Sequence, residues 1–285
     1  MTTRLITRPI PRTGEAIPAV GLGTWQTFDT GDAPAERAPL AEVLEAFLGG
    51  GGRVIDSSPM YGRAEGVVGD LLAARPGGST ASPHPLRLPF LATKVWTRGR
   101  AEGEAQMRRS MQLMRAPRMD LMQVHNLVDW RTHLETLRAW KKEGLVRYIG
   151  VTHYQLGAFG DLERIATKEA IDFVQLPYSI ATRDAEARLL PAAAASGVAV
   201  LVMRPFEEGA LFTRVRGKTL PPWAADFDCA SWAQFFLKFI LGHPAVTCPI
   251  PATASAKHLA DNLAAGRGRL PDAATRKKMI EFFGA

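Results

Sequence analysis

The sequence has few cysteines and no long apolar run. Only Cys229 and Cys248 occur among its 285 residues, so no disulfide framework is implied and we expect two small buried residues. No apolar run approaches the ~18 residues that a membrane span needs, and the first residues show no signal-peptide core. We therefore expect no membrane partner and a cytoplasmic location, or a periplasmic one for a chain from which a signal peptide has been removed.

Long basic runs are also missing, although the chain is basic. It carries 35 Lys and Arg against 28 Asp and Glu, a formal net charge of +7. A nucleic-acid-binding surface usually shows Lys and Arg in a stripe or run, whereas the densest basic stretches here, at 214–218 and 276–278, are short. We expect solvated helix faces and no nucleic-acid partner. A basic surface beside a cleft would still favour an anionic ligand such as a dinucleotide.

A glycine-rich turn of the Rossmann type, directly after a strand and opening a helix, is absent too. Glycines 49–52 precede an apolar run instead, as at a helix end. Short apolar runs and helical stretches alternate along the chain. Strands are expected at 20–24, 54–56, 90–94, 121–125, 148–152, 173–176, 198–203 and 246–250, with helices near 35–50, 64–74, 102–115, 131–143, 155–167, 184–196, 229–241 and 256–265.

Eight strand–helix units predict an α/β fold with a parallel sheet closed into a (β/α)8 TIM barrel, one domain over residues 1–285. A turn region at 9–14 predicts an N-terminal β-hairpin before the barrel. Two connections are long. The segment 75–89 enters the third strand, and we expect a solvated loop. The segment 205–228 follows the seventh strand on the catalytic face, where it could fold over a ligand.

Four chemically active side chains stand at or just after the ends of predicted strands: Asp56, Tyr61, Lys94 and His125. The carboxyl ends of barrel strands share one rim, so these residues are expected to meet. A free tyrosine, with a pKa of about 10, is a poor acid at neutral pH. A neighbouring ammonium lowers that pKa, and a carboxylate keeps the lysine charged and oriented. The set predicts a site that protonates a carbonyl oxygen, to which His125 donates a hydrogen bond.

With these residues the sequence resembles the aldo-keto reductases. The resemblance covers nearly the whole chain, through the segments at 21–25, 56–62, 93–94, 124–126, 148–152, 250–253 and 261–262. It implies that Tyr61 is the general acid, that Lys94 and Asp56 tune it, and that His125 orients a small carbonyl substrate. It also implies a monomer. The long C-terminal loop of some relatives is expected to be missing.

The resemblance further implies a nicotinamide dinucleotide bound in extended form across the rim, with NADPH favoured and NADH left open. Gln175 matches the residue that bonds the nicotinamide carboxamide. The positions that the resemblance assigns to the cofactor are Gly23, Thr24, Trp25, Thr152, His153, Gln175, Met203, Arg204, Pro205, Phe206, Ile250, Pro251, Thr253, Ser255, Lys257, His258 and Asn262.

The sequence departs from the family pattern around this cofactor. Thr152 and His153 stand where the family has Ser-Asn, and Met203 replaces an aromatic residue that stacks on the nicotinamide. Ala252 and His258 occupy positions that carry a lysine and an arginine in NADPH-binding relatives. Hydroxyls and a lysine at a helix start can still hold a phosphate; Thr253, Ser255 and Lys257 supply them.

Tryptophans near strand ends predict an apolar substrate pocket, formed by Trp25, Trp96 and Trp130. Two other functions stay open at this point. Lys94 could form a Schiff base, as in barrel aldolases, or the protein could be a nucleotide-sensing or regulatory subunit with little turnover. A metal site is not expected, because the first strand offers no His or Asp ligand.

Overall fold

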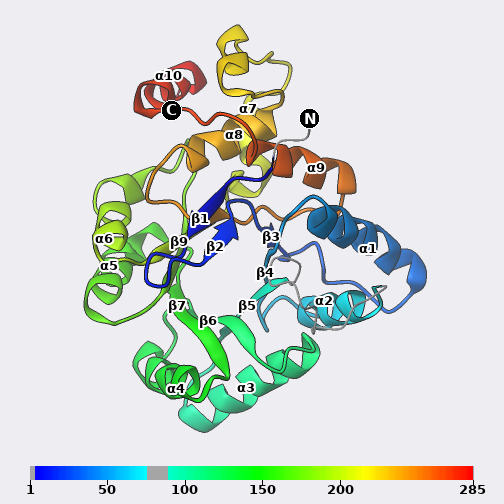
Figure 1. Cartoon of the computed structure of the whole chain (residues 1–285), viewed down its shortest axis with the longest axis vertical. Coiled ribbons are helices and arrows are strands. Elements are labelled where there is room, and N and C mark those ends of the chain that lie inside the picture. The colour runs from blue at the N-terminus through cyan, green and yellow to red at the C-terminus, as the bar shows by residue number, and fades with distance from the viewer. Residues whose placement is uncertain (1–3, 76–88, 285) are drawn as a thin grey trace.

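The computed structural model describes residues 4–75 and 89–284 (Figure 1). The loop predicted at residues 75–89 therefore falls almost wholly outside the described residues. Eight parallel strands form one sheet in which each strand pairs with its neighbours in the sequence. The strands are β3 (Leu22–Gly23), β4 (Val54–Asp56), β5 (Phe90–Val95), β6 (Met119–His125), β7 (Val146–Thr152), β8 (Phe173–Pro177), β9 (Ala199–Met203) and β10 (Cys248–Pro249).

The first and last strands of this sheet join and close it. The Gly21 amide donates to the Pro249 carbonyl (2.9 Å), and the Gly23 amide donates to the Pro251 carbonyl (3.1 Å). Glycine is needed at position 23, since a Cβ there would lie only 2.7 Å from the Ile250 carbonyl oxygen. The closed parallel sheet confirms the predicted (β/α)8 barrel.

Helices surround the barrel (Figure 1). Their apolar faces and the outer faces of the strands form the larger core, which includes Val67, Met107, Leu137 and Ile165. The helices are α1 (Pro34–Gly49), α2 (Ala64–Ala73), α3 (Arg100–Leu113), α4 (Trp130–Glu143), α5 (Phe159–Lys168), α6 (Leu189–Ala195), α7 (Ala210–Arg214), α8 (Trp232–Leu241), α9 (Ala256–Ala265) and α10 (Ala273–Phe283).

Some helix boundaries differ from those expected. The helix predicted at 184–196 divides into a 3-10 turn, Asp184–Glu186, and the short α6. The start of α8 lies at Trp232 because the Ser231 side chain accepts a hydrogen bond from the Gln234 amide and caps the helix. The long connection after β9 is not structureless, since it contains α7 and a 3-10 segment, Pro222–Phe227.

The predicted N-terminal hairpin is present as β1 (Thr7–Pro9) and β2 (Ala16–Pro18), paired antiparallel. It lies over the centre of the barrel in Figure 1. Ile10 and Ile17 are fully buried in the cluster that fills the barrel interior. The hairpin therefore plugs the end of the barrel opposite the predicted site.

Inside the barrel, apolar and polar side chains occupy different levels. Alternate residues of a strand face the same side. The interior apolar cluster contains Val54, Phe90, Leu121 and Phe173, all on the amino-terminal parts of their strands. Two or four residues later, the same faces carry Asp56, Lys94, Gln123, His125 and Gln175. The carboxyl-end rim of the barrel is thus lined by polar side chains.

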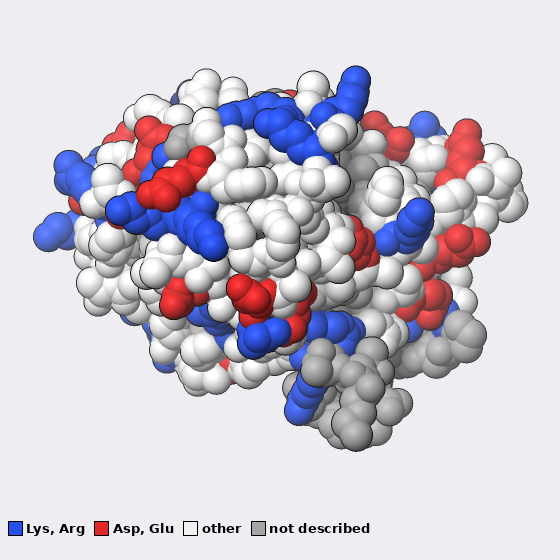
Figure 2. Space-filling model, turned by 90° about the horizontal axis from the view of Figure 1, so that it is seen from above, with Lys and Arg blue, Asp and Glu red and all other residues white. Residues whose placement is uncertain are grey.

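Acidic and basic side chains are both scattered over the surface seen from above in Figure 2, with broad uncharged areas between them. Cys229 and Cys248 are free and buried, as predicted. Within the described ranges, no helix has the length and apolar character that crossing a membrane requires.

Candidate active site

A buried ion pair forms the base of the site. Lys94 Nζ donates to Asp56 Oδ2 and to the Ser57 carbonyl, each at 2.6 Å. Gln123 Nε2 donates to the other carboxylate oxygen at 3.1 Å. The Lys94 side chain is wholly buried and that of Asp56 nearly so. Burial opposes the charged ammonium, but Asp56 and Tyr61 outweigh it and raise the pKa of Lys94.

Tyr61 lies on the loop between β4 and α2, beside this pair. Lys94 Nζ is 5.0 Å from the centre of its ring. Burial raises the pKa of Tyr61 above its usual value of 10, and Lys94 acts in the opposite sense. Lys94 therefore lowers the pKa of Tyr61, as the sequence suggests, but burial raises that pKa by more. Tyr61 is therefore a neutral phenol. When it gives up its proton, the resulting phenolate has the fixed Lys94 ammonium beside it.

His125 ends β6 and faces Tyr61 across the rim. The two rings are edge to face with centres 6.0 Å apart. The centre of the Trp96 ring lies 6.4 Å from the centre of the imidazole. Nδ1 is 3.0 Å from Ser58 Oγ. Burial, with the nearby Lys94 charge, lowers the pKa of His125 to about 2. The imidazole is therefore neutral at ordinary pH.

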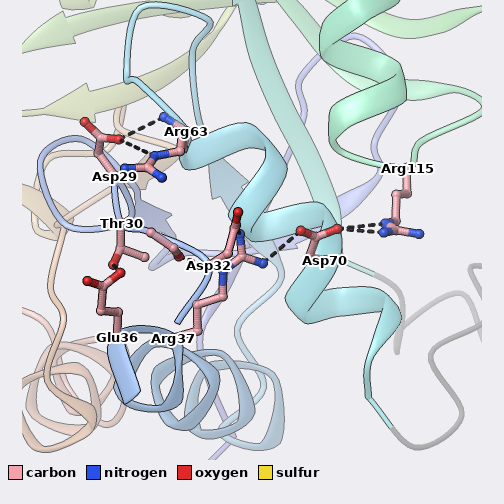
Figure 3. A network of polar contacts seen from close by, with 9 residues as sticks. Asp29, Thr30, Asp32, Glu36, Arg37, Arg63, Asp70 and Arg115 are labelled. Atoms are coloured by element: carbon pink, nitrogen blue, oxygen red, sulfur yellow. Dashed lines mark hydrogen bonds and ion pairs between the residues drawn. The ribbon is translucent and has the colours of Figure 1, made fainter. Parts of the chain in front are cut away.

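The loop that carries Tyr61 is held from its outer side (Figure 3). Asp29, in the loop after β3, accepts a hydrogen bond from the Arg63 amide (2.9 Å) and lies 4.0 Å from Arg63 Nε. Arg37 of α1 donates to Asp70 of α2 at 2.8 Å. The first contact ties the end of the Tyr61 loop to the loop after β3, and the second joins the two helices, without involving the groups inside the barrel.

A cavity of about 500 Å³ lies between this loop, α2 and α3. It borders Pro59, Gly62 and Gln106 but none of Asp56, Tyr61, Lys94 and His125, so it lies outside the barrel site. At its floor is Glu65, which is buried and accepts hydrogen bonds from Thr93 (2.5 Å) and Ser110 (3.1 Å). Burial raises the pKa of Glu65, although both hydroxyls lower it.

Next to His125, three buried polar groups have no hydrogen-bond partner among the described residues: Asn126 Oδ1, Thr152 Oγ1 and Gln175 Nε2. The sheet register places His125 beside Thr152, and Thr152 beside Gln175. Buried polar groups normally find partners. Two of these groups are oxygens that can accept hydrogen bonds, and the third is an amide N–H that can donate one. Together they match the NH2 and C=O groups of a ligand that carries a carboxamide.

The other predicted cofactor positions lie on this rim and the loops beyond it. Gly23 ends β3 and Thr24 follows it, with Thr24 Oγ1 donating to the Asp56 carbonyl (3.1 Å). His153 follows Thr152, stacks on Tyr154 with ring centres 5.6 Å apart, and accepts a bond from the Gln155 amide at Nδ1. Burial lowers its pKa.

The segment after β9 has an unusual backbone. Met203 is half-buried against the barrel interior. Arg204 adopts a φ of 53°, pairs with Glu208 and lies 5.5 Å from the Tyr154 ring. Pro205 is buried, and the Phe206 ring packs at a tilt against Phe212 with ring centres 5.0 Å apart. Met203 is thus the side chain that this strand presents to the rim.

The segment after β10 leads into α9. Ile250 and Pro251 are buried beside β3, whereas Ala252 is exposed. Thr253 Oγ1 accepts from the Ser255 amide (3.1 Å), and Ser255 Oγ caps α9 by accepting from the His258 amide (3.4 Å). Both hydroxyls keep a proton to donate. Lys257 and His258 are exposed, and Asn262 is buried one turn further along α9.

The three predicted pocket tryptophans differ in position. Trp25 and Trp96 are exposed by 37% and 42%, and Trp96 faces His125. Trp130 lies at the start of α4 with Arg131 4.3 Å and Arg164 5.5 Å from its ring. Trp96 is therefore the best placed of the three to touch a substrate. No group of three or more potential His, Cys, Asp or Glu metal ligands occurs in the part of the chain that is described.

The model of the Aldo/keto reductase family matches residues 19–277. The chain belongs to this family.

Among curated aldo/keto reductase relatives, the uncharacterized oxidoreductase YtbE of Bacillus subtilis is 27% identical over 258 residues, 87% of this chain and 84% of its own length. The uncharacterized oxidoreductase C215.11c of Schizosaccharomyces pombe is 28% identical over 159 residues, 55% of this chain. The chain spans only half the length of that relative.

An aldo-keto reductase from Klebsiella pneumoniae, solved in complex with NADPH, superimposes with a TM-score of 0.76 at 24% identity, covering 99% of this chain and 96% of its own. This likeness concerns the fold.

Three residues of this aldo/keto reductase site were not assigned a role from the sequence: Ser58, Gln123 and Asn126. Gln123 precedes His125 by two residues, so strand alternation already indicates that both face the interior. Ser58 and Asn126 follow strand ends, where the backbone leaves the regular pattern. Their contacts depend on loop conformation, which alternation does not specify.

Proposed function

We propose that this aldo/keto reductase reduces a small aldehyde or ketone to an alcohol, with NADPH as hydride donor and Tyr61 as general acid. The observation that carries the proposal is the contact chain Asp56–Lys94–Tyr61, with a 2.6 Å ion pair whose ammonium lies 5.0 Å from the phenol ring. The His125 ring lies edge to face against the same phenol.

The chain's own residues supply the proton. Because burial raises its pKa, Tyr61 holds its proton until a carbonyl oxygen becomes basic. The phenolate that remains is then stabilised by the Lys94 ammonium. Asp56 and the Ser57 carbonyl fix that ammonium in place, so the charge is already oriented before the proton moves.

His125 has a different task. A neutral imidazole does not compete with Tyr61 as an acid, but its N–H can hold the carbonyl oxygen against the phenol. Trp96 borders the same space. Together with the exposed Trp25 and Met60, it favours substrates with an apolar group next to the carbonyl.

Three partnerless groups, on Asn126, Thr152 and Gln175, fit the carboxamide of a nicotinamide ring. When bound, NADPH supplies the hydride. Met203 would lie at the ring face where an aromatic residue is usual in the family. Thr253, Ser255, Lys257 and His258, around the start of α9, would hold the 2′-phosphate.

The aldolase alternative is less consistent with the geometry. A Schiff-base lysine must attack as a neutral amine, whereas Lys94 is ion-paired and its pKa is raised. The regulatory alternative has no observation in its favour, because the acid, its cation and the orienting imidazole are all retained.

The test is an absorbance assay of NADPH and NADH oxidation against a panel of aldehydes, ketones and sugars, together with a fluorescence measurement of cofactor binding. Turnover of apolar aldehydes, faster with NADPH, is expected. Tight binding without oxidation across the whole panel would contradict the proposal and support a regulatory subunit. A Lys94 adduct trapped by borohydride would instead support the aldolase.

A further inference from the structure

The hydroxyl of Ser58 is the only group bonded to the His125 ring among the residues that the structure describes. Ser58 is fully buried, and its Oγ lies 3.0 Å from Nδ1. The Met60 amide is 3.4 Å from the same oxygen. No partner in the described residues bonds Nε2, and the imidazole ring lies in contact with the rings of Tyr61 and Trp96.

The directions of these two bonds follow from their chemistry. A backbone amide can only donate, so Ser58 Oγ accepts from Met60. The Ser58 hydroxyl proton then needs an acceptor, and among the described residues His125 Nδ1 is the one within reach. If Nδ1 carried a proton instead, it would point at an oxygen whose own proton had no acceptor in a buried site. The arrangement favours a bare Nδ1.

Since the His125 imidazole is neutral, it carries one N–H, and a bare Nδ1 places that proton on Nε2. We propose that Ser58 is a positioning residue that fixes His125 as the Nε2–H tautomer, so that the imidazole donates to the carbonyl oxygen of the substrate. This inference rests on the proposed reductase function for its role, but the tautomer itself does not depend on turnover.

The tautomer matters because the two forms treat a carbonyl oppositely. Nε2–H donates to the oxygen and strengthens the bond as negative charge develops there. A bare Nε2 presents a lone pair to the same oxygen and repels it. Ser58 would therefore act on the reaction through His125, without touching substrate or cofactor, and its loss should change catalysis more than cofactor binding.

The direct test is long-range ¹H–¹⁵N NMR of the six histidines, with the His125 signals assigned by their loss in His125→Gln. Wild type is expected to show His125 as a single Nε2–H tautomer from pH 5 to pH 8. Ser58→Ala should give a mixture of tautomers, and Ser58→Thr, which retains a hydroxyl, should restore the single form. Ser110→Ala, which removes a buried hydroxyl outside the barrel, should leave the His125 signals unchanged.

The kinetic test uses the same variants with NADPH and benzaldehyde. Ser58→Ala should lower kcat/KM for the aldehyde by about tenfold while the Kd for NADPH stays within about twofold, and Ser58→Thr should recover most of the loss. A wild-type His125 protonated at Nδ1, or a Ser58→Ala protein with unchanged tautomer and kcat/KM, would overturn the inference. Absence of turnover in wild type with the Nε2–H tautomer present would instead contradict only the proposed function.

Discussion

Lys94 Nζ and Asp56 Oδ2 are 2.6 Å apart inside the barrel, and neither side chain is open to solvent. Removing two charges from water is costly unless each is fully partnered. Here the ammonium also bonds the Ser57 carbonyl, and the carboxylate also accepts from Gln123. The pair is therefore a rigid, satisfied unit, and losing one member leaves the other charged and buried.

Breaking this pair should cost stability as well as activity. Lys94→Met leaves the Asp56 carboxylate unpaired and is expected to lower the free energy of unfolding by about 3–5 kcal/mol. The double variant Lys94→Met/Asp56→Asn removes both charges and should recover part of that loss. Urea denaturation of both single variants and the double measures this coupling. Strict additivity would show that the two charges do not depend on each other.

The pH dependence of reduction should be flat over the neutral range. Reduction needs the Tyr61 phenol, whose pKa is raised above 10, and a neutral His125, whose pKa is lowered to about 2. Neither group changes protonation between pH 6 and pH 9. The expected kcat/KM is constant there and falls only in more alkaline solution, whereas alcohol oxidation, which needs the phenolate, rises with pH. A reductive profile falling with an apparent pKa near 7 would contradict these assignments.

The buried polar groups that lack a partner on the rim should contribute to ligand binding and not to the stability of the apoprotein. Thr152→Val removes a buried hydroxyl that has no partner in the described residues. It should leave the apoprotein as stable as wild type, or more so, yet weaken NADPH binding by about tenfold. Fluorescence titration and thermal unfolding without cofactor check the two effects. Thr167→Val, on the exposed face of α5, is the matched control and should alter neither the affinity nor the catalytic rate.

Glu65 should make stability depend on pH. Its folded pKa is raised above the usual 4.5, chiefly by burial, so the folded state holds this proton more tightly than the unfolded chain does. Its contribution is fully present below about pH 4.5 and is lost as the pH rises through the folded pKa. Glu65→Gln removes this titration. The stability of the variant relative to wild type should increase with pH, and a difference independent of pH would show that Glu65 ionises normally.

Much of the barrel and its chemistry follows from local pattern in the sequence. Strand alternation places Asp56, Lys94 and His125 on inward faces, and parallel topology brings strand ends to one rim. These two rules suffice to predict that Asp56, Lys94 and His125 meet at the rim, whereas the place of Tyr61 depends on the conformation of the loop after β4. The N-terminal hairpin is likewise readable from its turn residues, although its role in plugging the barrel is not.

Other features depend on tertiary context. Whether burial or Lys94 determines the pKa of Tyr61 is a question of desolvation, which sequence spacing does not report. The bond between Ser58 and His125 joins a loop to a strand 67 residues away, so no local rule reveals it. The helix expected at 184–196 divides at Arg188, whose φ of −143° is not helical. Helix propensity is a weak guide beside tertiary packing, so the sequence does not reveal this break.

The central claim is that Tyr61 delivers the proton, and Tyr61→Phe tests it most directly. The variant removes one hydroxyl and keeps the ring beside Lys94. Reductive kcat with NADPH and an aldehyde that wild type reduces should fall by about 10²–10⁴-fold, while the Kd for NADPH, measured by fluorescence, should stay near the wild-type value. A variant that binds NADPH normally and turns over at the wild-type rate would contradict the account.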